Sequence, residues 1–219
     1  MHERATVSWR LLAWHGRRAS LVMAIALVFG NATVTSAKAK DPKSSFVATF
    51  AQACVPKRLS HAATNAHVAA TGWVEVVGDQ YPRLKTVLAA ADAELAGSKE
   101  PGWIFRRKAF RKLIDDRAHF LVTTYVHAPD VITLAGCYLY DFNATSAIQP
   151  IAVSDLLGRA RARTTPFEGA LVHIWGPSPR FQRTLDTYLY HVPAGSALAK
   201  RAGFTGVMLK FETSIETPE

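Results

Sequence analysis

The chain has 219 residues, of which 49% are hydrophobic, and it carries a formal net charge of +9. A single hydrophobic core is the expectation for this length and composition. Much of the positive charge lies in the first 39 residues, and without them 21 cations and 16 anions remain, a net charge of +5. That value is ordinary for a folded protein and argues against a nucleic-acid partner.

The first 39 residues have the organisation of a secretory signal peptide. Arginines at positions 4, 10, 17 and 18 precede an apolar run at residues 21–30, and Ala37-Lys38-Ala39 matches an A-x-A cleavage site. The run is too short to span a bilayer as a helix, which needs about 20 apolar residues. We therefore expect residues 1–39 to be cleaved after Ala39 and residues 40–219 to form one periplasmic or secreted bacterial domain. An uncleaved membrane anchor is the alternative.

The chain contains two cysteines, Cys54 and Cys137. Disulfides persist in exported proteins, so we expect these two residues to pair. Two buried free thiols are the alternative. A lipid-modified cysteine directly follows the apolar run of its signal peptide, whereas Cys54 lies 24 residues beyond Gly30. The lipoprotein interpretation of Cys54 therefore fails on position.

Three helices are expected before any long strand. Asp41-Pro42 is a good helix start, Phe46, Phe50 and Cys54 recur at helical spacing, and Pro56 ends the pattern. Small residues at helical spacing continue up to residue 72, and a third helix is predicted at residues 82–95. Cys54 thus lies in the last turn of the first helix and faces the same way as its phenylalanines.

A short apolar run at residues 103–105 predicts a strand, and a dense group of cations follows it. These cations are Arg106, Arg107, Lys108, Arg111 and Lys112. Charge runs are usually solvated surface, here beside two aspartates at 115 and 116. The alternative is a patch that contacts an anionic membrane surface, a lipid headgroup or an acidic partner.

Residues 117–142 are expected to form a β-hairpin that turns at Pro129-Asp130. With Ala128 opposite Val131, Cys137 would share a small aliphatic face with Val122, and we assign that face to the core. The opposite face combines aromatic rings with polar atoms, which suits a ligand or a partner protein. Its candidate residues are His119, Tyr125, His127, Tyr138 and Tyr140. The alternative is that other elements cover this face as ordinary core.

After the hairpin, a short helix is predicted from about residue 153 to residue 158, and the arginines at 159, 161 and 163 indicate an exposed linker. Three more strands are expected at residues 170–175, 181–192 and 204–212. The predicted class is α+β: N-terminal helices packed on a mainly antiparallel sheet of about five to six strands, with one short intervening helix.

The common motifs of hydrolases, nucleotide-binding proteins and redox proteins are absent from the sequence. We therefore predict no catalytic residues, no metal and no cofactor. The leading hypothesis is a non-enzymatic exported protein that binds a partner protein or a small ligand. An envelope hydrolase remains the alternative, with His119, His127, His173 or His191 as its base. Peripheral binding to an anionic membrane surface is a weaker alternative.

A resemblance supports the same location. The order of Phe50-x-x-x-Cys54, Gly72-Trp73, Trp103, Gly136-Cys137 and a short helix ending in Leu-Leu-Gly is similar to that of small uncharacterised exported bacterial proteins with one disulfide. The resemblance spans most of residues 40–219. It implies export and a disulfide, and it carries no activity.

Overall fold

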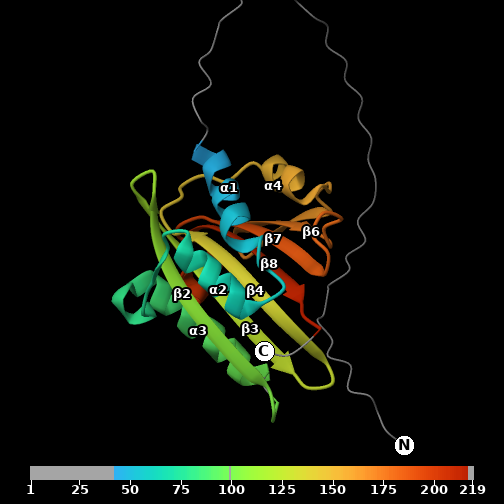
Figure 1. The fold of residues 1–219 in the computed structure, drawn as a ribbon. Helices are drawn as coiled ribbons and strands as arrows, with labels where there is room; N and C mark the ends of the chain where they lie inside the picture. Colours follow the sequence, from blue (N-terminus) through green and yellow to red (C-terminus); the bar gives the residue numbers. More distant parts are fainter. Residues whose placement is uncertain (1–41, 99, 217–219) are drawn as a thin grey trace, which may run out of the picture. The chain divides into compact units, whose positions relative to one another are not determined.

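The computed structural model describes residues 42–98 and 100–216, which all belong to one compact unit (Figure 1). The predicted signal peptide and its cleavage site lie outside the described residues, as does Asp41 at the expected start of the first helix.

The described residues contain one antiparallel sheet of eight strands, in the order β1-β2-β3-β4-β8-β7-β6-β5. The strands are β1 Val74–Glu75, β2 Ile104–Ile114, β3 Arg117–Ala128, β4 Ile132–Asp141, β5 Arg163–Phe167, β6 Ala170–Trp175, β7 Thr184–Val192 and β8 Gly206–Ser214. A mixed fold of helices on an antiparallel sheet is confirmed, whereas the predicted strand number of five to six is too low.

The two additional strands are the edges of the sheet, β1 and β5. Every residue of both strands is exposed, so neither shows the alternation of buried and exposed residues by which strands are recognised. The arginine-rich linker expected around residues 159–163 ends in β5, which pairs with β6. The cation-rich segment after residue 105 is also strand, because β2 continues to Ile114.

The described residues include five α-helices and one short 3-10 helix, η1 Gly78–Gln80. The α-helices are α1 Pro42–Cys54, α2 His61–Ala70, α3 Pro82–Ser98, α4 Pro150–Leu157 and α5 Ala197–Ala202. Two hydroxyl caps fix helix starts: the Ser60 side chain accepts from the Ala63 amide, and the Ser196 side chain accepts from the Ala199 amide.

Helices cover both faces of the sheet. Helices α1, α2 and α4 lie on one side of it in Figure 1, and α3 lies behind it. On the first side Phe50 of α1 meets Phe211 of β8 edge to face, with ring centroids 5.1 Å apart. On the second side Leu84 of α3 and Leu198 of α5 belong to a cluster with Phe120 of β3. The sheet is therefore the middle layer between two hydrophobic clusters.

The predicted register of the β3–β4 hairpin is wrong by one residue. The structure pairs Thr123 with Cys137 and Ala128 with Ile132, so Val131 stays in the loop. Since side chains alternate along a strand, this slip moves every β4 side chain to the other face relative to β3. Cys137 therefore shares a face with Thr123 and not with Val122.

Pro129 is the physical reason for the three-residue loop. Two-residue hairpin loops need a positive φ at their first central residue, and the proline ring holds φ near about −65°. The chain instead forms a turn in which the Val131 amide donates to the Ala128 carbonyl. Asp130 takes the positive φ of 58° at the third position, as in a type II turn with proline at its second position.

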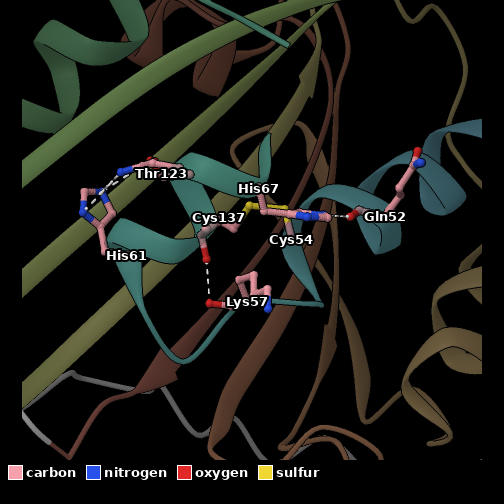
Figure 2. The surroundings of a disulfide bond; sticks show 9 residues. Gln52, Cys54, Lys57, His61, His67, Thr123 and Cys137 are labelled. Atoms are coloured by element: carbon pink, nitrogen blue, oxygen red, sulfur yellow. Dashed lines mark hydrogen bonds between the residues drawn. A yellow bond between two sulfur atoms is a disulfide. The ribbon is translucent and has the colours of Figure 1, made fainter. Parts of the chain in front are cut away.

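The Cys54–Cys137 disulfide is confirmed. It joins the last turn of α1 to the middle of β4, across a Cα–Cα distance of 5.8 Å and 83 residues of sequence. Both cysteines are buried, and Figure 2 shows the bond between the helices and the strand. The bond fastens α1 to the sheet face that α1, α2 and α4 cover.

Candidate functional site

The five residues predicted as a ligand or partner face do not share a face. The register places His119, Tyr125 and His127 beneath α1 and α2, and it places Tyr138 and Tyr140 on the face of α3 and α5. Tyr125 is fully buried, and His119 and Tyr140 are also buried. Most of this predicted surface is therefore buried.

His119 lies in a buried charged group. Its Nε2 is 3.7 Å from Oδ2 of buried Asp141, which also pairs with Arg117. Its Nδ1 forms a 3.1 Å hydrogen bond with the Arg117 carbonyl, and the Phe46 ring of α1 packs beside it. Burial lowers the pKa of His119 below its ordinary value, against the raising effects of the carbonyl and of Asp141. Both ring nitrogens thus face protein groups, as expected of a structural histidine.

The other three histidines considered as hydrolase bases also have protein partners. His127 Nδ1 contacts the Thr133 hydroxyl at 2.9 Å, and His173 Nδ1 contacts the Thr164 hydroxyl at 2.8 Å. His191 forms a hydrogen bond with the backbone of Thr145, and burial lowers the pKa of both His173 and His191. Among the described residues, none of the four combines a hydroxyl on one nitrogen with a carboxylate on the other, which is the arrangement of a hydrolytic triad.

The five cations of β2 lie on both faces of the sheet. Alternation puts Arg106, Lys108 and Lys112 on the α2 side and Arg107 and Arg111 on the α3 side. Each has a partner: Arg107 bonds both carboxylate oxygens of Asp92, Lys108 bonds Glu75 and Lys112 donates to the Thr71 carbonyl. Arg106 and Arg111 lie over the rings of Tyr125 and Tyr81. They do not form one continuous basic surface.

A polar cluster adjoins the disulfide on the α2 side. The Thr123 hydroxyl donates to Asn65 Oδ1 at 2.6 Å and lies 3.4 Å from His61 Nε2. Figure 2 shows His61 and Thr123 facing each other across α2 and β3. The hollow that His61, Thr123 and the disulfide line has a volume of about 10 Å³. That is room for one water molecule, so this cluster is too closely packed for a larger ligand.

A tyrosine cluster lies on the opposite face of the sheet. Tyr138 donates to Glu212 at 2.7 Å, and the Lys210 ammonium lies 5.5 Å from the Tyr138 ring centroid and 4.9 Å from that of Tyr188. Burial raises the pKa of Tyr138 well above its ordinary value, and the Glu212 carboxylate adds to the shift. Tyr138 lies over Gly136, where a Cβ atom would be 2.8 Å from its ring. The side chains of this cluster thus contact one another.

A second hollow is an aromatic pocket at the start of α3, with a volume of about 170 Å³. Its lining residues are Tyr81, Pro82, Arg83, Leu84, Phe120, Phe142 and Asn143. Leu84, Phe120 and Phe142 are buried and form the floor, whereas Pro82, Arg83 and Asn143 are exposed at the rim.

Three segments position the walls of this pocket. Tyr81 precedes Pro82, which begins α3, and its ring meets the Phe120 ring edge to face at 5.1 Å. Phe142 follows the last residue of β4 and packs against Phe120 at 5.3 Å. Arg83 Nη1 donates to the Phe142 carbonyl at 2.7 Å and to Asn143 Oδ1 at 3.0 Å. These two bonds tie α3 to the loop after β4 and hold the guanidinium at the mouth of the pocket.

This pocket was not predicted from the sequence. Its residues come from positions 81–84, 120 and 142–143, and no motif connects them. These positions are far apart in the chain and share no spacing pattern, so no local signal in the sequence could have indicated the pocket.

Comparison with protein-family models, with curated proteins and with solved structures finds no match for this chain. Within the described residues, no three histidines, cysteines or carboxylates come together as metal ligands. None of the helices in the described ranges combines the length and the apolar character of a membrane span.

Proposed function

We propose that this chain is an exported, non-enzymatic binding protein that holds a small ligand with one aromatic ring in the aromatic pocket. The observation that carries the proposal is the pocket volume of about 170 Å³ above a floor of Leu84, Phe120 and Phe142. Small-molecule sites are typically apolar hollows with a few polar groups at defined positions, and the rim of this pocket supplies Arg83 and Asn143.

The volume of the pocket limits the size of the ligand. An apolar protein cavity of about 150 Å³ accommodates benzene. The aromatic pocket has a comparable volume and is open at its rim, so one ring can lie on the floor while a substituent extends past Arg83. Edge-to-face contact with Tyr81 or Phe120 would favour an aromatic ring over an aliphatic group of equal volume.

Three features support the remaining parts of the proposal. A buried disulfide is typical of proteins that leave the reducing cytoplasm, which is consistent with export. His119 and His191 bond to backbone groups, and His127 and His173 bond to hydroxyl groups. None of them forms a triad in the described residues, which favours binding over catalysis. Membrane binding through the cations of β2 would need them on one surface, whereas they lie on two faces of the sheet and bind protein groups there.

Binding can be tested by following amide NMR signals of the purified protein during titration with phenol, benzyl alcohol, benzamide and benzoate. We expect millimolar affinity, about −4 kcal/mol, which is reasonable for ligands of this size. The shifted signals should belong to the first turn of α3 and to residues 142–143, because these segments form the rim.

Tyr81→Ala is the informative variant, because Tyr81 is a half-buried wall of the pocket. We expect it to weaken ring binding at least about fivefold, the loss of one aromatic contact of about 1 kcal/mol. Tyr188→Ala is the matched control, since Tyr188 is also half-buried but lies outside the pocket lining. The proposal is wrong if none of the four compounds shifts the rim signals, or if both variants weaken binding equally.

A further inference from the structure

We infer that the ligand of the aromatic pocket carries an anionic group, which Arg83 binds at the rim. This inference rests on the proposed function and names the chemical class of its ligand: an aromatic ring with a carboxylate, or with another small oxyanion, next to it. Arginine suits this role because its guanidinium presents donors in a planar fork that matches two oxygens of one anion.

Arg83 keeps donors available at the rim. Its Nη1 makes both of its hydrogen bonds, to the Phe142 carbonyl and to Asn143 Oδ1. Neither its Nη2 nor its Nε bonds to any described residue. Because Nη1 is tied on both sides, the orientation of the guanidinium is set before a ligand arrives. An anion would therefore meet the remaining nitrogens with little ordering cost.

The charges around the pocket have the sign that such a ligand needs. Arg83 forms no ion pair with any described residue, and neither does Arg111, whose guanidinium carbon lies 5.8 Å from the Tyr81 ring centroid. Arg107, Arg117 and Arg201 do have carboxylate partners. The positive charges of Arg83 and Arg111 are thus not compensated by an ion pair with any acidic side chain of the described residues.

The remaining groups at the pocket agree with this sign. None of its lining residues is acidic. The nearby carboxylate of Asp141 is buried on the other side of the sheet, where it pairs with Arg117 and accepts from the Asn143 amide. Arg83 also lies in the first turn of the 17-residue helix α3, at the positive end of its dipole. Together these groups favour an anion over a cation at the rim.

Benzoate and benzamide provide the test, because they share ring and shape and differ in charge. We expect the protein to bind benzoate at least about threefold more tightly than benzamide, since charge-assisted hydrogen bonds to an exposed arginine exceed neutral ones by a modest amount. Arg83→Gln should remove this preference, so that the variant binds benzoate and benzamide equally. The preference should also decrease as salt is added, because the rim is exposed.

Lys85→Gln is the matched control. It removes the same charge from the same helix, but Lys85 is exposed, pairs with Asp79 and does not line the pocket. The benzoate preference should survive this change. Equal binding of benzoate and benzamide, or equal loss of preference in both variants, overturns the inference and leaves the proposed function standing. If neither benzoate nor benzamide binds, the inference is wrong; if phenol and benzyl alcohol also fail to bind, the proposed function is wrong with it.

Discussion

The disulfide provides the sharpest stability prediction. Cys54 and Cys137 are 83 residues apart in sequence, so their bond removes the freedom of a long loop from the unfolded chain. The chain-entropy relation puts this effect at about 4.5 kcal/mol at 25 °C. Since a whole domain is stable by only about 5–15 kcal/mol, breaking the bond should remove a large part of the free energy of unfolding.

Three variants test the value: Cys54→Ala, Cys137→Ala and the double substitution. Each breaks the same bond, so we expect all three to lose nearly the same free energy, about 3–5 kcal/mol including the small loss of packing around the buried sulfur atoms. Urea unfolding followed by circular dichroism measures the loss. With a slope of about 2 kcal/mol/M, the midpoint should fall by roughly 2 M.

The double variant separates the bond from its surroundings. The parent protein is measured without reductant, and the single variants with reductant, so that free thiols do not join two chains. If the double variant lost the sum of the two single losses, each cysteine would act through its own packing and not through the bond. A loss below about 1 kcal/mol in all three would refute the loop-entropy reasoning altogether.

The remaining predictions concern backbone space and pH. At Gly206, with φ +104°, a Cβ atom would lie 2.1 Å from the Asp141 carbonyl oxygen. Gly206→Ala should therefore lower the free energy of unfolding, measured in urea, by about 3 kcal/mol or more. Gly195→Ala, with φ +82° and open space, should lose only about 1 kcal/mol, and equal losses would contradict the steric argument. Burial lowers the pKa of His119 below 6.5, so below that pH the folded protein binds fewer protons than the unfolded chain, and stability should fall as the pH drops. His119→Gln should flatten the pH dependence measured by unfolding between pH 7.5 and 5, and an unchanged slope would assign it to other groups.

The disulfide was predictable although the hairpin register was not predicted correctly. Only two cysteines are present, so their pairing follows from the expected compartment without any knowledge of register. A correct prediction of the register also required the backbone preference of Pro129. Pro129 cannot take the positive φ that the first residue of a tight two-residue loop requires, and this property was visible in the sequence. Using it would have placed Cys137 opposite Thr123.

The edge strands could not be predicted from local patterns. Strand β1 has two residues and strand β5 has five, all exposed. Their extended conformation comes from hydrogen bonds to β2 and β6, which are non-local contacts. The cationic stretch of β2 was difficult for a related reason. Its strand character rests on two adjacent buried residues, Ala109 and Phe110, between charged side chains that bind partners on both faces.

The aromatic pocket shows why the site was not predictable from this sequence. The hairpin prediction assumed that one face of the sheet is core and the other is surface, so aromatic residues on the second face became binding candidates. In the structure helices cover both faces of the sheet, and α3 and α5 cover the face on which Phe120 and Tyr140 are buried. The first turn of α3 reaches the end of β4 without filling the space above Phe142. The candidate binding site therefore lies at the start of α3, beside Tyr81 and Arg83. When a helix covers most of a sheet face, the aromatic rings of that face stay accessible only beside the end of the helix. Which rings these are depends on where the helix lies, and the sequence does not give that position.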